Sequence, residues 1–326
     1  MIQQLISVII PVYNLEEYIV RTLNSVFSQT YSNIEVVAVD DGSTDKSPSL
    51  LDAYAEKESR LKVIHKQNEG VSKARMAGVA AAAGDYIGFV DGDDLIDPNM
   101  YERLLNNAVK YKAEISHCGY RLIRPDGSVD FFYNTGEIIL QNNEQGIFDL
   151  LSGSKIEPGL CNKLFRATLF HSLLHNRNMD FSLLLNEDFL MNYFLFKECQ
   201  KSIFEDFCPY QYIKREGSAS QSVSRLMDYE HPVRVRQIIY NDCVGTKFEK
   251  VAQTIYVSKT LHKISEISCV KEDSFNDFKN EMIDIIKNNK SIISSLSFKQ
   301  KINAFLLINM PRTYHFINKF YRKTKD

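Results

Sequence analysis

The sequence of 326 residues contains no tryptophan, only six cysteines and a net charge of only −2. No two cysteines form a CxxC pair, which argues against a zinc site and against a disulfide framework. The near balance of 39 basic and 41 acidic side chains gives no bulk positive field for nucleic acid. No apolar run reaches the roughly eighteen residues that a membrane-spanning helix needs. We therefore expect a chain that binds no nucleic acid and does not span a bilayer.

A signal-peptide pattern is also missing, because no basic segment precedes the strand-like run at residues 6–10. We expect the protein to stay in the cytoplasm. The length and the 44% hydrophobic content suit one large domain with an appendage. The charges are uneven along the chain: residues 1–100 hold eight basic and fifteen acidic side chains, whereas residues 297–326 hold seven basic and one acidic. The near-neutral total therefore conceals an acidic head and a basic tail.

The first 110 residues alternate strand-like and helix-like segments. Short apolar runs predict strands at 7–12, 34–39, 61–64 and 86–90. Helical patterns follow them, starting at a capping box over Asn14–Glu17, which includes Glu16, at Ser47, at Val71 and at Asp97. This alternation predicts an α/β fold with a Rossmann-like, mainly parallel sheet. In such sheets ligands bind beyond the carboxyl ends of the strands.

The pattern changes in the remaining two thirds of the chain. Strand-like segments at 115–120 and 131–133, separated by a Pro-Asp-Gly turn, predict a small antiparallel part. Strand patterns end near residue 225, and helical patterns continue to the end. We predict a domain at 1–220 and a helical C-terminal region at 221–326.

Two acidic clusters directly follow predicted strands. Asp40 and Asp41 come after the second strand, and Asp91, Asp93 and Asp94 come after the fourth. Like charges at one edge of a sheet cost free energy unless a cation or a set of donors lies among them. Hard carboxylate oxygens favour Mg²⁺ or Mn²⁺ over zinc, so we predict a divalent-metal site. Ordinary turn formation is the alternative for either cluster alone.

Other nucleotide and cation motifs are missing. Neither GxxxxGK[ST] nor GxGxxG follows the first strand, so a nucleotide is not held as in a P-loop ATPase or a dinucleotide dehydrogenase. The segment from Asp91 is not an EF-hand loop, because Leu95 and Ile96 stand where that loop needs a ligand and a glycine.

The motifs of the chain resemble those of family 2 glycosyltransferases with the GT-A fold. They occur in family order from residue 6 to about 190, at Ser7–Asn14, Ser28–Thr30, Val39–Asp45, Asn68–Arg75, Gly84–Ile87, Phe89–Asp94, Asn162–Arg166 and Asn186–Asp188. The resemblance implies nucleotide-sugar binding and leaves the sugar open. It also implies that residues 1–110 form the nucleotide-sugar-binding half of a catalytic domain and residues 111–220 the acceptor half.

The resemblance implies roles for single residues. Tyr13 would pack on the base, and Asp41 would hydrogen-bond the uracil edge of a UDP-sugar. Asp91 and Asp93 would be the DxD pair, with Asp93 on the Mn²⁺ or Mg²⁺ ion. Arg75 suits phosphate because its fork donates in pairs. The full implied donor set is Pro11, Tyr13, Asp41, Asn68, Arg75, Asp91 and Gly92, with Glu16, Asp40, Asp94 and Glu187 in a second rank.

Asp188, next to Glu187, is implied to be the catalytic base. Loss of the nucleotide diphosphate leaves negative charge that the metal and Arg75 neutralise, so no general acid is needed. A base on the opposite face of the sugar then takes the proton of the acceptor hydroxyl, and we predict inversion. The alternative for Glu187 and Asp188 is a helix N-terminus that favours acids. Cys161 stands where family members often carry Trp, so the resemblance does not extend to this part of the acceptor wall.

The basic tail suggests a surface role. On a helical projection from Pro311, apolar side chains fill one arc and Arg312, Lys319, Arg322 and Lys323 fill the opposite arc. Such a segment suits an anionic membrane surface, where a lipid-linked acceptor would be met. A helix packed on its own domain and homo-oligomerisation through the helical region are the alternatives.

The sequence therefore predicts a metal-dependent, inverting glycosyltransferase at the inner face of the membrane. Its donor would be a UDP-sugar, and its acceptor a hydroxyl of a growing surface glycan or lipid-linked oligosaccharide. Two alternatives stay open. One is transfer to a protein or glycoprotein, and the other is a catalytically idle nucleotide-sugar-binding partner of another transferase.

Overall fold

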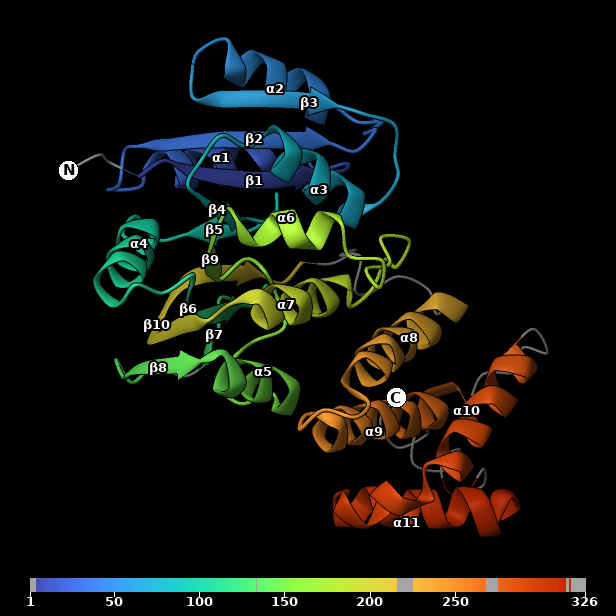
Figure 1. The fold of residues 1–326 in the computed structure, drawn as a ribbon. Coiled ribbons are helices and arrows are strands. Elements are labelled where there is room, and N and C mark those ends of the chain that lie inside the picture. The colour runs from blue at the N-terminus through green and yellow to red at the C-terminus, as the bar shows by residue number, and fades with distance from the viewer. Residues whose placement is uncertain (1–3, 133, 216–224, 268–274, 315–316, 318–326) are drawn as a thin grey trace. The chain divides into compact units, whose positions relative to one another are not determined.

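The computed structural model describes residues 4–132, 134–215, 225–267, 275–314 and 317 (Figure 1). It divides into two compact units, Met1–Ser222 and Val223–Asp326. The boundary predicted at residue 220 lies beside this division. Of the basic arc predicted in the tail, Lys319, Arg322 and Lys323 lie outside the described residues.

The first unit is built on one mixed sheet. Its first strands are β1 (Ile6–Val12), β2 (Ile34–Asp40), β3 (Leu61–His65) and β4 (Tyr86–Phe89), which lie parallel in the order β3-β2-β1-β4. Every residue of β1 is buried, as expected for an apolar parallel strand that is covered on both faces. Because β2 and β4 flank β1 in the same direction, the two acidic clusters lie at one edge of the sheet, as predicted.

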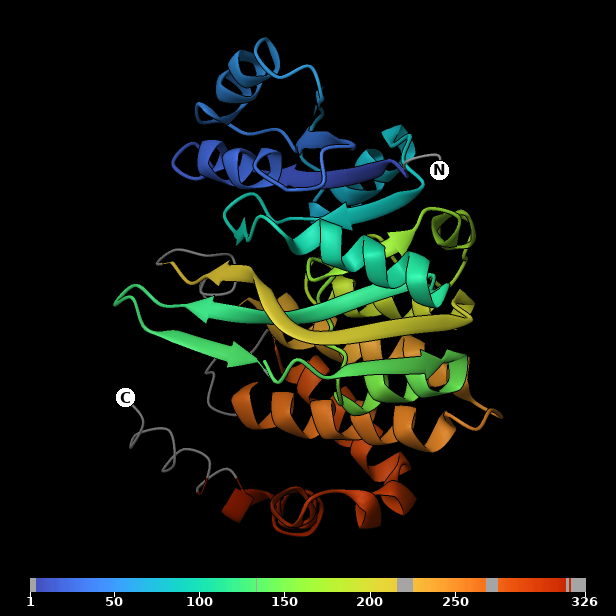
Figure 2. The same cartoon turned by 90° about the vertical axis from the view of Figure 1, so that its left-hand side faces the viewer.

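Helices cover both faces of this parallel part. Helices α1 (Ile19–Phe27) and α2 (Ser47–Ala55) lie on one face and α3 (Val71–Ala81) on the other (Figures 1 and 2). The connection from β3 back to β4 runs across the sheet in the opposite direction, so a right-handed crossover puts α3 on the opposite face. In α3, a side chain at Gly78 would clash with Ile9 of β1. This close packing holds the helix that carries Arg75 against the sheet.

The second half of the unit adds the predicted antiparallel part, after α4 (Met100–Tyr111). Strand β9 (Lys163–Arg166) pairs antiparallel with both β4 and β6 (Ile115–Ile123). Strand β10 (Lys201–Ile213) then runs parallel to β6. The remaining strands, β5 (Leu95–Ile96), β7 (Val129–Phe132) and β8 (Ile138–Asn142), pair antiparallel with β10, β6 and β10. Helix α7 (Glu187–Glu198) contacts α5 (Asn143–Ser152) and α6 (Leu169–Leu174).

The capping box predicted over Asn14–Glu17 is wrong. Helix α1 begins at Ile19, and Asn14 adopts a left-handed backbone conformation with φ 52°. Its side-chain oxygen accepts the backbone N–H of Thr44 at 2.8 Å, and the Glu16 carboxylate accepts that of Lys46 at 2.9 Å. Both side chains do accept backbone N–H groups, as capping residues would. The groups that donate to them belong to the loop from β2 to α2 and not to the first turn of α1.

The cap predicted at Asp97 is also wrong. Helix α4 begins at Met100 after Asn99, and the Asp97 carboxylate accepts two hydrogen bonds of 2.7 Å from Arg121 of β6. Asp97 therefore links the segment before α4 to strand β6 in the second half of the sheet. A distant arginine competes with the local backbone for this carboxylate, which a local pattern cannot reveal.

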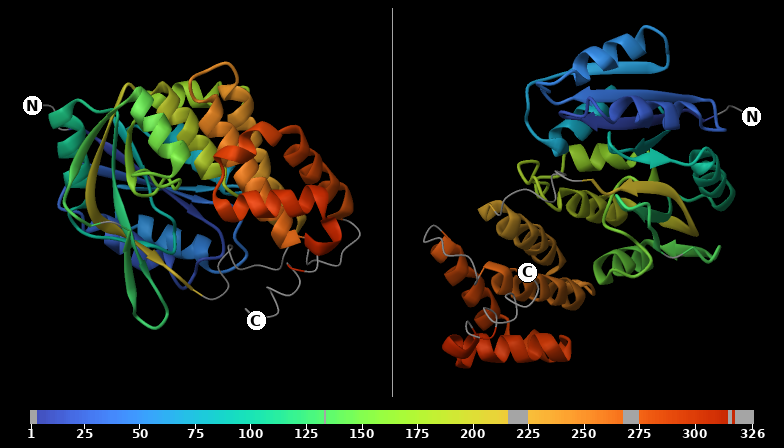
Figure 3. Two further views of the ribbon diagram at one scale, coloured as in Figure 1. Left: turned by 90° about the horizontal axis from the view of Figure 1, so that it is seen from below. Right: turned by 180° about the vertical axis from the view of Figure 1, so that it is seen from behind.

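The second unit is helical, as predicted, and Figure 3 shows its helices from two sides. It comprises α8 (Leu226–Cys243), α9 (Glu249–Ile267), α10 (Asn276–Asn288), a 3₁₀ turn (Lys290–Ser295) and α11 (Phe298–Asn309). Its core includes the buried side chains of Val257, Leu261, Met282 and Ile286. Across the described parts of both units, no helix combines the length and the apolar character that crossing a membrane requires.

Candidate functional site

The DxD segment leaves β4 as a tight turn at the edge of the sheet. The backbone N–H of Asp94 donates to the carbonyl of Asp91 at 3.0 Å. The buried Asp94 carboxylate accepts the Tyr210 hydroxyl at 2.6 Å and the backbone N–H of Ile213 at 2.8 Å. Burial, followed by the charges of Asp91 and Asp93, raises the pKa of Asp94 well above its usual value. Asp94 thus fixes the turn to β10, while the side chains of Asp91 and Asp93 keep 35% and 22% of their surface exposed.

Glycine is required at position 92 by close packing. A Cβ atom there would lie 2.7 Å from Leu15 and 3.1 Å from the carbonyl oxygen of Pro11. The Gly92 carbonyl accepts the Thr22 hydroxyl at 3.0 Å. Pro11 and Gly92, both predicted donor residues, therefore shape the backbone on which the two acidic side chains stand.

Arg75 connects the two acidic motifs of the site. Its Nη2 lies 2.9 Å from Oδ1 of Asp91, and its Nη1 lies 2.8 Å from Oε1 of Glu187. Only 7% of the Arg75 side chain is exposed. The sequence predicts that Arg75 approaches the donor, and the structure adds that it holds Asp91 beside the start of α7.

A second arginine, which sequence reasoning missed, contacts the other acid of the pair. Nε of Arg215 lies 2.7 Å from Oδ2 of Asp93. The Arg215 guanidinium also lies 4.7 Å from the centre of the Tyr18 ring, and Arg21 lies over the same ring at 4.9 Å. Arg215 follows β10, far from Asp93 in sequence, so no motif links the two residues.

A cavity of about 220 Å³ opens beside this arginine–carboxylate network. Its lining includes Arg75, Asp91, Asp94, Glu157 and Asp188. Asp188 lies in the first turn of α7, and burial raises its pKa. The structure therefore brings the predicted base and the predicted donor residues Asp91 and Arg75 to one cavity.

The buried ammonium group of Lys163 supports the cavity wall at residues 157–161. Nζ of Lys163 donates to the backbone carbonyls of Glu157 at 2.8 Å and Gly159 at 2.5 Å. Asn192 of α7 also donates to the Gly159 carbonyl, at 2.9 Å. Burial lowers the pKa of Lys163 to about 8. Lys163 belongs to a motif that the sequence shows, but its role as a support of the wall is visible only in the structure.

Cys161, which stands at the position of the expected tryptophan, lies in this wall. It is buried and lines the cavity. Burial raises the pKa of its thiol well above the usual value, so it acts as a small apolar side chain.

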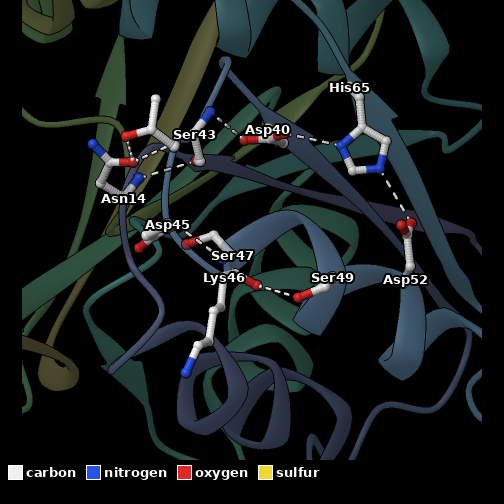
Figure 4. A network of polar contacts seen from close by, with 10 residues as sticks. Asn14, Asp40, Ser43, Asp45, Lys46, Ser47, Ser49, Asp52 and His65 are labelled. Atoms are coloured by element: carbon white, nitrogen blue, oxygen red, sulfur yellow. Dashed lines mark hydrogen bonds and ion pairs between the residues drawn. The ribbon is translucent and has the colours of Figure 1, made fainter.

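The first acidic cluster, Asp40 and Asp41, is paired with protein donors. Asp40 accepts the backbone N–H of Ser43 and contacts His65, both at 2.9 Å, and His65 also contacts Asp52 (Figure 4). The Asp41 side chain is buried, with the residue only 4% exposed, and its carboxylate accepts a hydrogen bond of 2.8 Å from the ammonium group of Lys66. The two aspartates therefore find protein donors, and a metal is not needed to explain them.

Asp41 nevertheless orders the loop that carries Asn68. Its carboxylate accepts the backbone N–H groups of Glu69 at 3.1 Å and Gly70 at 2.8 Å. Asn68 is exposed in this loop, and Tyr13 at the end of β1 is 48% exposed. The contacts of Tyr13, Asp41 and Asn68 with a uracil base stay predictions.

Asp91 and Asp93 are the side chains that would hold a divalent metal ion. Across the described residues, no three His, Cys, Asp or Glu side chains are grouped to hold an ion. The ion pairs use Oδ1 of Asp91 and Oδ2 of Asp93, and each carboxylate has a second oxygen. Mg²⁺ and Mn²⁺ commonly take one or two protein carboxylates and complete their shell with phosphate and water. The residues therefore fit an ion shared with a diphosphate and do not fit an all-protein cage.

Residues 7–173 match the family described as glycosyl transferase family 2. The chain belongs to glycosyl transferase family 2. Among its relatives, the glycosyltransferase GlyG of Streptococcus pneumoniae is 31% identical over 251 residues, which are 74% of this chain and 81% of GlyG. GlyA of the same organism is 32% identical over 223 residues, or 66% of this chain and 31% of GlyA. The match thus spans about a third of GlyA.

Solved structures show the same fold for this family 2 chain. TarS residues 1–349 of S. aureus, in complex with UDP-GlcNAc, superpose with a TM-score of 0.75 at 20% identity, covering 98% of this chain and 92% of the TarS chain. The complex of TarS with UDP gives a TM-score of 0.72. The predicted GT-A architecture, with a mainly parallel sheet and a helical C-terminal region, is confirmed.

Proposed function

We propose that this family 2 chain is a metal-dependent, inverting glycosyltransferase that uses a UDP-sugar. Its acceptor would be a hydroxyl of a growing surface glycan or of a lipid-linked oligosaccharide. One observation carries the proposal: Arg75 joins Asp91, the first acid of the DxD pair, to Glu187, which directly precedes Asp188. Donor-binding and proton-accepting groups are thereby held at one cavity.

The donor side needs positive charge. The cavity-lining residues include four acidic residues and one arginine, and this arginine already pairs with Asp91, so a diphosphate needs further positive charge. We place Mn²⁺ or Mg²⁺ on Asp93 with Asp91 as its partner. When bound, the ion would neutralise the charge that grows on the leaving diphosphate. UDP is supported as the carrier by the shared fold with TarS, whose complexes contain UDP-GlcNAc and UDP.

Asp188 would accept the proton of the acceptor hydroxyl. It lines the cavity together with Asp91 and Arg75, and its raised pKa makes it a stronger base than an exposed aspartate. Attack from its side of the sugar, opposite the departing diphosphate, inverts the anomeric centre. Glu187 would not act as the base, because Arg75 holds its carboxylate at 2.8 Å.

A donor panel tests this proposal. UDP- and GDP-sugars are incubated with the protein and with Mn²⁺, Mg²⁺ or EDTA, and release of the nucleotide is measured. We expect hydrolysis of at least one UDP-sugar that stops in EDTA, and a loss of this hydrolysis in Asp188→Asn with UDP binding retained. Metal-dependent UDP binding without any turnover would support the idle-partner alternative instead.

We also propose that the second unit contacts an anionic membrane surface. Helix α11 exposes Phe298 (80%), Ile302 (44%) and Phe305 (58%), which are spaced to lie along one side of the helix. An exposed apolar side on a helix with nearby lysines suits the headgroup region of a bilayer. The same side could instead bind a second copy of the chain.

Vesicle flotation separates these two uses. We expect the full chain to float with vesicles of anionic lipid, and F298S/F305S to float several-fold less. Light scattering without lipid is the companion measurement. A stable dimer that the double variant dissociates, together with no flotation, would replace the membrane proposal by oligomerisation.

A further inference from the structure

Aromatic rings lie on three neighbouring strands beside the cavity. Tyr120 of β6 and Tyr212 of β10 line the cavity. Phe132 of β7 is the register partner of Tyr120, and the two rings are stacked with centres 4.2 Å apart and an interplanar angle of 13°. The row of rings therefore runs from the cavity onto the β6–β7 hairpin, which projects from the sheet in Figure 2.

An irregularity in β10 creates this row. The register against β6 shifts between Glu205, which pairs with Cys118, and Tyr210, which pairs with Tyr120. Without the shift, Phe207 would pair with Tyr120, and Pro209 would pair with Leu122. Bulges near active sites commonly re-aim side chains in this way. The bulge therefore brings Tyr210 and Tyr212 to the face of the sheet that carries Tyr120.

Glycine at position 119 accommodates the bulge. A Cβ atom there would lie 2.7 Å from the carbonyl oxygen of Phe132 and 2.8 Å from Sγ of Cys208. The carbonyl oxygen of Phe132 in β7 and Sγ of Cys208 in β10 thus leave no room for a side chain between them, next to the stacked rings. Stacking on Phe132 fixes the orientation of Tyr120, so the ring can bind a ligand at little cost in side-chain entropy.

The charges of the cavity restrict what this row can bind. The acidic lining residues include Glu157 on the wall and Asp188 in the first turn of α7. Arg75 is the cation among the lining residues, and both of its terminal nitrogens are already paired with carboxylates. A polyanionic acceptor would therefore meet repulsion close to the base. An uncharged ligand with an apolar face would not.

We infer that Tyr120, Phe132 and Tyr212 form an aromatic platform that binds an uncharged sugar ring of the acceptor. The C–H face of a pyranose is apolar, and packing it on aromatic rings removes apolar area from water while its hydroxyls stay solvated. The platform begins in the cavity that Asp188 lines, so a glycan lying along it would present one hydroxyl to the base. This inference deepens the proposed function and rests on it.

The absence of tryptophan from the chain gives a direct test. Phe132→Trp keeps an aromatic ring on Tyr120 and makes a single fluorescent reporter. Phe131→Trp is the matched control, because neighbouring residues of a strand point to opposite faces. Both variants are titrated with the neutral trisaccharides maltotriose, cellotriose and chitotriose and with the anionic trigalacturonate, with and without UDP and Mn²⁺.

We expect at least one neutral trisaccharide to shift the emission of F132W and not of F131W. Adding Tyr212→Ala should weaken this binding at least fivefold, whereas Tyr212→Phe should retain it. Tyr212 is 37% exposed, so its truncation should leave the fold intact, which a melting curve checks. Trigalacturonate should bind at least fivefold more weakly. No response to any neutral sugar, no effect of Y212A, or tighter binding of the anion would each overturn the platform.

Failure of the platform can be told from failure of the proposed function. UDP binding and UDP-sugar hydrolysis are measured on the same F132W protein, and neither requires an acceptor glycan. If UDP binds and the donor is hydrolysed but no neutral sugar responds, only the platform is wrong. If neutral sugars respond but UDP never binds, the platform stands as a glycan site and the transferase proposal is wrong.

Discussion

Arg75 and Glu187 form a buried ion pair across the candidate site, with Nη1 and Oε1 2.8 Å apart and less than a tenth of either side chain exposed. The other terminal nitrogen of Arg75 holds Asp91 at 2.9 Å. One guanidinium therefore sets the distance between the DxD segment after β4 and the first turn of α7. We therefore expect the proposed donor binding and proton transfer to depend on this bridge.

Replacing Arg75 should damage both stability and activity. Arg75→Ala leaves two carboxylates without their cation, and breaking a buried pair in this way costs about 3–5 kcal/mol of unfolding free energy. Arg75→Lys keeps the charge but lacks the fork that reaches both partners. We expect R75K to retain most of the stability and to lose at least about 100-fold in kcat/KM for donor hydrolysis, which corresponds to about 2.7 kcal/mol.

Urea unfolding and nucleotide release are measured for both variants. Arg60→Lys is the matched control, because Arg60 pairs with Glu58 at 2.7 Å with 35% and 23% of the two side chains exposed, far from full burial. Such exposed pairs contribute at most about 1 kcal/mol. An R75K enzyme as active as R60K would show that the bridge has no part in catalysis.

Asp188 and Glu157 line the same cavity, so their amide variants identify the base. Asp188→Asn should lower kcat by about 10²-fold or more, since loss of a general base costs about that factor. Glu157→Gln should change kcat by less than about tenfold. Calorimetry should find UDP affinity unchanged in both. The reverse order of the two effects would make Glu157 the base.

The pH dependence of turnover should report the environment of Asp188. A base must be ionised to accept a proton, and burial raises the pKa of this aspartate above 3.8. Activity should therefore fall on the acid side at a pH higher than an exposed aspartate would give, and rise again as pH increases through the raised pKa. The profile of kcat/KM for a UDP-sugar checks this, and a limb at or below pH 4 would contradict it.

The parallel half of the fold follows closely from the sequence, because apolar runs with polar ends are local signals. Strand β1 and helix α3 lie where the pattern puts them. The roles of Asn14 and Asp97 do not follow, because each side chain serves a segment distant in sequence. Local capping patterns show which side chains can accept a hydrogen bond, but not which backbone will donate it.

Some residues of the candidate site could likewise be predicted from the sequence, and others could not. Asp91 and Asp188 can be named from the sequence, because Asp91 directly follows a predicted strand and Asp188 lies in a motif that resembles the family. Tyr212 and Arg215 carry no such signal. Tyr212 reaches the cavity through a register shift in β10, and Arg215 meets Asp93 across more than a hundred residues of sequence. Long-range register has no local pattern, so these residues required the structure.

Arg215 should compete with a divalent cation for Asp93. Its Nε lies 2.7 Å from the carboxylate that we propose as the metal ligand. Arg215→Gln removes this competing charge, so free Mn²⁺, followed by electron paramagnetic resonance without donor, should bind at least about threefold more tightly. The effect should vanish in the background of Asp93→Asn. Weaker Mn²⁺ binding in R215Q would instead make Arg215 a support of the site.

Lys163 should stabilise the cavity wall. Lys163→Met leaves the carbonyls of Glu157 and Gly159 with fewer donors, and unsatisfied buried groups cost about 1–3 kcal/mol each. We expect a lower melting temperature and slower transfer with UDP affinity unchanged. Lys110→Met, on the exposed end of α4, is the matched control and should change the melting temperature little. Equal melting temperatures for both variants would contradict this role.

The central claim is that one cavity joins a metal-assisted UDP site to the base Asp188. Calorimetric titration of UDP into the wild type, Asp93→Asn and Asp188→Asn, each with Mn²⁺ and with EDTA, tests it most directly. We predict Mn²⁺-dependent binding to the wild type, binding weakened at least about tenfold in D93N, and wild-type binding in a D188N protein that no longer hydrolyses the donor. UDP binding that is absent from the wild type, or that is unaffected by both EDTA and D93N, would contradict the claim.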